Sequence, residues 1–178
     1  MKPSNLRVLA CLLPLVVVSC ADRESGTPRR IEQRQEPIGG GLDIRIHPTQ
    51  GWDTPPAHII LIDAQKRKTG VDPGTGAKLT AIPNSSYEAE SIGDAETGAP
   101  GPETRIIYVR NAMAGNYTLQ VIGTKSAPYH LEVRGLDRDL RPSSQQFLDV
   151  RIDAGDRHRY VIDYSTKKGS QVEVTRLR

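Results

Sequence analysis

Cysteine is almost absent from this 178-residue chain, because Cys11 and Cys20 are its two cysteines. Cys11 lies inside an apolar N-terminal stretch that we expect to be removed, so Cys20 becomes the first residue of the processed chain. A single terminal cysteine excludes an intramolecular disulfide and a cysteine-based metal centre. The hydrophobic core therefore has to stabilise the fold without covalent cross-links.

Aromatic residues are also scarce, at 4% of the chain, with one Trp and one Phe. The core must come from Ile, Leu, Val and the six Tyr residues. An excess of charge is missing as well: without Lys2 and Arg7 of the N-terminal stretch, 22 basic residues face 21 acidic ones. Such a balance gives no support for nucleic-acid binding.

Catalytic motifs are missing too. The four histidines stand in four separate segments, and no nucleophile elbow, zinc-binding helix motif or phosphate-binding glycine loop occurs. His130 and His158 fall on the polar positions of alternating stretches, so we expect ordinary surface histidines there. These absences predict that the protein is not an enzyme.

Alternation of apolar and polar residues is the dominant pattern that is present. Within Arg105–Val133, the apolar residues of two stretches recur at every second position, and 29 Gly and Pro residues punctuate the whole chain. Period-two alternation predicts strands with one buried and one wet face. We interpret Arg105–Val133 as a meander of three consecutive antiparallel strands, around which the other strands pack.

The same pattern extends from residue 42 to residue 178. Ala57–Asp63 is a continuous apolar run, which predicts an interior strand. Leu148, Val150 and Ile152 alternate with polar residues, which predicts one buried row. We therefore expect an all-β antiparallel sandwich of the jelly-roll or immunoglobulin-like kind, with about eight to ten strands.

Residues 1–19 have the three parts of an export signal. Lys2 and Arg7 precede an apolar run too short to span a bilayer, which ends in Val17-Val18-Ser19-Cys20. This ending resembles the lipobox of bacterial lipoproteins, which implies cleavage before Cys20 and acylation of its thiol. Two or more acyl chains are needed for a stable anchor. The alternative is an ordinary secretory leader followed by a chance cysteine.

Residues 20–41 have the composition of a flexible tether. Polar and charged residues dominate it, so it cannot bury enough apolar surface to fold. Ala21 after the acylated cysteine favours the outer membrane over the inner membrane, although Asp22 leaves that choice open. We expect a cell-envelope protein whose membrane partner is bound through the acyl chains on Cys20.

A second resemblance concerns the folded part. The stretches Ala114–Thr124 and Ala154–Tyr160 are similar to segments of bacterial pre-peptidase C-terminal-like domains, and His58–Gly76 fits the same pattern of strand and turn motifs. The resemblance covers roughly residues 42–165 and implies a β-sandwich with an accessory, adhesion or display role. In those proteins the module accompanies an enzyme, whereas here it stands alone.

The acidic residues of the chain suggest a possible calcium site. Calcium takes six to eight oxygen ligands, and five acidic residues crowd neighbouring segments: Asp63, Asp72, Glu88, Glu90 and Asp94. Turn chemistry is the competing explanation for Asp72-Pro73-Gly74, because an Asp side chain binds its own backbone in such turns. Asp137-Arg138-Asp139 is interpreted as a solvated charge run.

The expected function is that of a non-catalytic, lipid-anchored binding or scaffolding module with a protein or glycan partner in the envelope. A carbohydrate- or peptidoglycan-binding module, with Trp52 stacking on sugar rings, is the first alternative. An accessory subunit of an envelope enzyme is the second.

Overall fold

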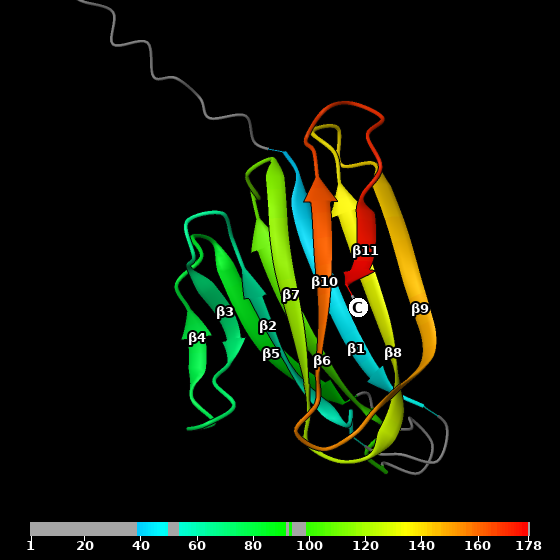
Figure 1. The fold of residues 1–178 in the computed structure, drawn as a ribbon. Helices are drawn as coiled ribbons and strands as arrows, with labels where there is room; N and C mark the ends of the chain where they lie inside the picture. The colour runs from blue at the N-terminus through cyan, green and yellow to red at the C-terminus, as the bar shows by residue number, and fades with distance from the viewer. Residues whose placement is uncertain (1–38, 50–53, 92, 94–98, 178) are drawn as a thin grey trace, which may run out of the picture. The chain divides into compact units, whose positions relative to one another are not determined.

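A computed structural model describes residues 39–49, 54–91, 93 and 99–177 of the chain. These residues form eleven β-strands in two antiparallel sheets (Figure 1). The predicted β-sandwich is confirmed, with slightly more strands than expected. No described residue belongs to a helix, so none of them forms a helix that could cross a bilayer. Residues 1–38, which include the predicted leader, Cys20 and most of the tether, lie outside the described part.

The first sheet has five strands in the order β5-β6-β1-β8-β9. Its strands are β1 (Gly41–Pro48), β5 (Ser85–Ser91), β6 (Glu103–Arg110), β8 (Ala127–Leu136) and β9 (Pro142–Ile152). Strand β1 occupies the middle and pairs with β6 on one side and β8 on the other. The N-terminal strand of the described domain is therefore a central strand, bonded along both edges.

The second sheet has six strands in the order β11-β10-β7-β2-β3-β4. Its strands are β2 (Ala57–Ile62), β3 (Lys68–Val71), β4 (Lys78–Thr80), β7 (Gly115–Gly123), β10 (Arg157–Tyr164) and β11 (Glu173–Leu177). Strand β2 lies between β7 and β3, and Ile59, Ile60 and Leu61 are all buried. The interior position predicted for the Ala57–Asp63 run is confirmed.

The predicted meander is wrong in its pairing, although its three strands are present. Strands β6 and β8 lie in the five-stranded sheet on either side of β1, whereas β7 lies in the other sheet. The chain crosses from one sheet to the other at both links and does not fold back on itself as hairpins. Alternation within a strand shows which face is apolar, but it does not identify the partner strand.

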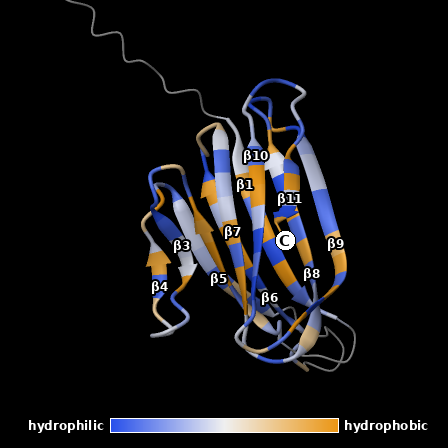
Figure 2. Ribbon diagram, viewed as in Figure 1, coloured by the Kyte–Doolittle hydropathy of each residue, from blue (hydrophilic) through white to orange (hydrophobic). Residues whose placement is uncertain are grey.

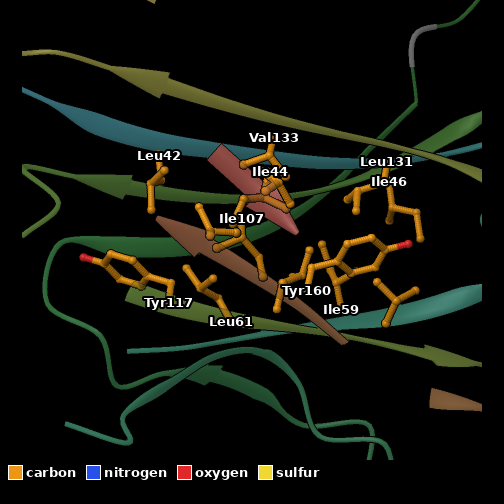
Figure 3. Close-up of a cluster of buried hydrophobic side chains, with 14 of the residues drawn as sticks. Leu42, Ile44, Ile46, Ile59, Leu61, Ile107, Tyr117, Leu131, Val133 and Tyr160 are labelled. Atoms are coloured by element: carbon orange, nitrogen blue, oxygen red, sulfur yellow. The ribbon is translucent and has the colours of Figure 1, made fainter. Parts of the chain in front are cut away.

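The core lies between the inner faces of the two sheets. Figure 3 shows Leu42, Ile44 and Ile46 of β1 facing side chains of the opposite sheet, such as Ile59 and Leu61. These five residues are between 0% and 2% exposed. Full burial of one such side chain contributes about 1.5–3 kcal/mol. Figure 2 shows the matching alternation of hydrophobic and hydrophilic residues along the strands.

Tyrosine hydroxyls carry the polar contacts inside the sandwich. Tyr129 of β8 and Tyr160 of β10 are both 0% exposed, and their hydroxyls lie 2.8 Å apart across the two sheets. The Tyr129 hydroxyl also lies 2.8 Å from Nδ1 of the half-buried His158. His158 was predicted to be an ordinary surface residue, and that prediction is wrong, because its ring binds a core hydroxyl.

A β-bulge in β9 changes which residues face the core. Phe147 pairs with Leu131, and Val150 pairs with Tyr129, so three steps along β9 match two steps along β8. The extra residue places Leu148 and Asp149 on the outside, with Asp149 at a φ of 52°. Leu148 is 60% exposed, so its predicted burial is wrong, whereas Val150 and Ile152 do pack against the core.

Candidate interaction surfaces

The structure gives Asp63, one of the predicted calcium ligands, partners within the turn that follows β2. Its Oδ1 accepts hydrogen bonds from the backbone N–H groups of Gln65 and Arg67 at 3.0 and 2.9 Å. Its Oδ2 lies 2.6 Å from Nε of Arg67. Asp63 as a whole is 6% exposed. Its hydrogen bonds hold the turn between β2 and β3 in place.

Asp72 also binds its own backbone, in the turn between β3 and β4. Its Oδ1 accepts from the N–H groups of Gly74 and Thr75 at 2.8 and 3.1 Å. These bonds, that of Gly74 first, lower the pKa of the Asp72 carboxyl. The turn explanation offered for Asp72-Pro73-Gly74 is thereby confirmed.

The remaining predicted site residues lie either on one face of a sheet or outside the described residues. Glu88 and Glu90 lie on the outer face of the edge strand β5, and Oε1 of Glu88 accepts from the Ser86 hydroxyl at 2.9 Å. Asp94, Trp52 and Cys20 lie outside the described residues. Within residues 39–49, 54–91, 93 and 99–177, no three His, Asp or Glu side chains are grouped so as to hold a metal ion. Calcium binding stays a prediction.

The outer face of the five-stranded sheet carries an ordered array of polar side chains, and we call it the polar face. Strand register sets its residues in cross-strand rows. Two rows run from β5 to β9, namely Ser86–Tyr108–Asp43–Arg134–Ser144 and Glu88–Ile106–Arg45–Glu132–Gln146. A third group joins two register pairs, Glu90–Thr104 and His47–His130, through the contact between Thr104 and His47. Directly opposed side chains in such rows are within reach of one another.

Arg45 is the centre of the polar face. Its guanidinium donates to Asp43 at 2.9 Å and to the Tyr108 hydroxyl at 3.1 Å, and it lies 5.8 Å from the Tyr108 ring centroid. The hydrogen bond to Asp43 is the main cause of the raised pKa of Arg45. Ile106 shares the row of Arg45 but is 0% exposed, so the long side chains around it must cover it. The face is therefore an ordered polar layer.

Two histidines oppose each other at one end of the polar face. His47 of β1 pairs with His130 of β8. Nδ1 of His47 lies 3.0 Å from the Thr104 hydroxyl, and Nε2 of His130 lies 3.1 Å from Oδ1 of Asp149. Burial, the largest cause, lowers the pKa of His47. The predicted outward position of His130 is confirmed.

Comparison with known proteins adds no relative. No family model, no curated protein and no solved structure matches the chain. The resemblances to the lipobox and to pre-peptidase C-terminal-like domains therefore stay predictions from the sequence.

The polar face is not recognisable in the amino-acid sequence. Alternation placed His130 on a wet face, but it gave no information on which strands are neighbours. Arg45, Tyr108 and Glu132 are neighbours because β1 lies between β6 and β8. The sequence does indicate that β1 and β8 are long strands with one exposed face, because apolar and polar residues alternate along both of them.

Proposed function

We propose that this protein is a non-catalytic, lipid-anchored module of the bacterial cell envelope that binds a partner protein through the polar face. The polar face is the observation that supports binding: five strands present neighbouring side chains of both charge signs, held by hydrogen bonds among themselves. Such an array offers a fixed pattern of charge to a complementary surface. Anchoring is supported by the Val17-Val18-Ser19-Cys20 ending of the leader.

The anchor is tested by metabolic labelling of cells with an alkyne analogue of palmitate. We expect label on the wild-type protein and its loss in Cys20→Ala, with release of that variant from the membrane fraction. Cys11→Ala is the matched control, since Cys11 lies in the leader and should be dispensable for labelling. An unlabelled wild-type protein would contradict the anchor.

Partner binding is tested with a photo-crosslinking residue in place of Tyr108 on the polar face. We expect a discrete crosslinked protein, which disappears when Arg45→Glu breaks the pattern of charge around the probe. The same residue in place of the exposed Arg159, on β10 of the other sheet, is the control. Binding to purified peptidoglycan without a protein crosslink would favour the glycan-binding alternative.

A further inference from the structure

Five connections meet at the end of the sandwich where the chain enters β1. They are residues 63–67, 81–84, 111–114, 137–141 and 165–172, and the last three can be followed at the upper end of Figure 1. We call this surface the entry end. Asn111 donates its N–H to the carbonyl of Gly40, and Arg138 donates its N–H to that of Thr166. The chain thus enters the domain among these loops.

The close packing at the entry requires glycine. A Cβ on Gly39 would collide with the Arg138 carbonyl, and a Cβ on Gly40 would collide with the Tyr164 hydroxyl. Gly40 also has a φ of 103°, which an L side chain rarely adopts. The two glycines therefore allow residues 39 and 40 to pack closely between the loops 111–114 and 137–141.

The entry end displays the two most exposed large apolar side chains of the described residues. Met113 is 64% exposed and Leu140 is 61% exposed, each on its own loop. Leu140 has a φ of 60°, an uncommon conformation for a branched side chain. Isolated exposed apolar side chains are common on protein surfaces, but these two lie at an end of the sandwich whose loops are rich in basic residues.

Both loops are pinned from beneath by buried groups. The Asp137 carboxylate, 2% exposed as a residue, accepts from the N–H groups of Asp139 and Arg141 and, on Oδ2, from Gly169 of the neighbouring loop at 2.8 Å. The Tyr117 hydroxyl donates to the Met113 carbonyl at 2.9 Å. The exposure of Leu140 and Met113 is therefore a property of a fixed loop structure.

Basic residues surround these two apolar side chains. The five loops carry six basic residues and three acidic ones. The basic residues are Lys66, Arg67, Arg138, Arg141, Lys167 and Lys168. Of the acidic ones, Asp63 and Asp137 are buried in turns, and Asp139 lies 3.3 Å from Lys168. Lys66 and Arg67 also line a shallow hollow of about 520 Å³ together with Lys68 and Lys78.

Two described turns at the opposite end of the sandwich have no such excess of basic residues. The turns at 124–126 and 153–156, which pack together through Gly123, carry Asp153 and Asp156 against Lys125. A domain with a basic, apolar-tipped end is oriented by an anionic surface.

We propose that the entry end docks onto the anionic headgroups of the membrane, with Leu140 and Met113 inserted at the interface and the basic residues in contact with the lipid phosphates. The inference rests on the proposed lipid anchor, which would keep the domain close to the membrane, but the contact is made by the domain itself. Apolar insertion combined with basic residues is the usual composition of an interfacial membrane contact. A docked entry end leaves the polar face, on the side of the sandwich, open to its partner.

The test uses the full processed chain with Trp52→Phe, so that a single tryptophan introduced as Leu140→Trp reports depth through quenching by brominated lipids. We expect quenching in vesicles of phosphatidylcholine with phosphatidylglycerol and none in phosphatidylcholine alone. Ala154→Trp, in an exposed turn at the opposite end, is the matched control and should stay unquenched. In about 1 M salt, where the Debye length is about 3 Å, the quenching at position 140 should disappear.

Two outcomes separate docking from anchoring. Retention on vesicles in high salt reports the anchor, whereas quenching in low salt reports docking. Retention without low-salt quenching would overturn the docking proposal and leave the anchor intact. Quenching with release in high salt would support docking and contradict the anchor.

Charge variants give the expected magnitude. Each basic residue near an anionic surface contributes about fivefold to binding, so Arg138→Gln with Lys167→Gln should lower the ratio of docked to undocked protein by about thirtyfold. Arg151→Gln with Arg157→Gln, two exposed residues away from the entry end, should leave the ratio unchanged. An equal effect of both pairs would overturn the proposal, as would co-sedimentation with purified peptidoglycan in place of vesicles.

Discussion

Two buried tyrosine hydroxyl groups link the two sheets inside the hydrophobic core. Tyr129 and Tyr160 meet at 2.8 Å in a region where both side chains are fully buried. Burial is the main reason that the pKa of each phenol is raised, so both stay protonated at every ordinary pH. The Tyr160 hydroxyl therefore depends on Tyr129 for its hydrogen bond, whereas the Tyr129 hydroxyl has both Tyr160 and His158 as partners.

We expect Tyr129→Phe to lower the free energy of unfolding by about 1–3 kcal/mol, because it leaves the Tyr160 hydroxyl buried without this partner. Tyr129→Phe combined with Tyr160→Phe should cost less than the sum of the two single changes, since no orphaned hydroxyl remains. Urea denaturation of the four proteins measures the coupling. Strict additivity would mean that the two hydroxyls do not depend on each other.

The roles of such residues were not visible in the sequence. Asp137 was interpreted as part of a solvated charge run, and that interpretation is wrong, because the residue is 2% exposed and accepts three backbone hydrogen bonds. One of its partners is Gly169, which lies 32 residues away in the sequence. Two charged neighbours in the chain gave no indication of that contact. Bonds from Gly169 first, and from Arg141, lower the pKa of Asp137.

Strands as elements were predictable, whereas their partners were not. The alternating residues of β1 and β8 point the way that the sequence predicted, since burial alternates with exposure along each of them. The strand pairing predicted for Arg105–Val133 is wrong, because local periodicity carries no information about which strand lies alongside. The polar face depends on pairing, which is why its rows could not be predicted.

The bulge in β9 leads to a prediction at the scale of the strand. We expect Leu148→Ser to change the free energy of unfolding by less than about 0.5 kcal/mol, because Leu148 is exposed on the outer surface. Phe147→Ala should lower the free energy of unfolding by about 2 kcal/mol or more, because the Phe147 ring packs edge-on against the Tyr160 ring, with 5.0 Å between the ring centroids. Chemical denaturation measures both. A larger loss for Leu148→Ser would place Leu148 inside and contradict the bulge.

For the whole molecule, three partly buried histidines set the response to acid. Burial is the first cause that lowers the pKa of His47, His58 and His158. His58 also accepts at Nδ1 from Arg105 at 3.2 Å, a bond that requires the neutral ring nitrogen. The unfolded chain, with histidine pKa values near about 6.5, therefore binds protons at a higher pH than the folded domain.

The sign of the effect follows from linkage. Stability is fully present above about pH 6.5 and is lost as the pH falls through the lower pKa values of the folded state. We expect the urea concentration at which half of the protein is unfolded to decrease as the pH is lowered from about 7 to about 5. The variant with His47→Gln, His58→Gln and His158→Gln should show a flatter profile. A wild-type midpoint that rises in this range would contradict the burial of the three rings.

The central place of β1 has a mechanical consequence. Because the chain enters at Gly41 and β1 is bonded to β6 and β8 along both edges, tension on the preceding segment pulls along the strand axis. Both hydrogen-bond ladders are then loaded at the same time in shear, and neither can unzip one bond at a time. A domain hung from its central strand resists being drawn out far better than one hung from an edge.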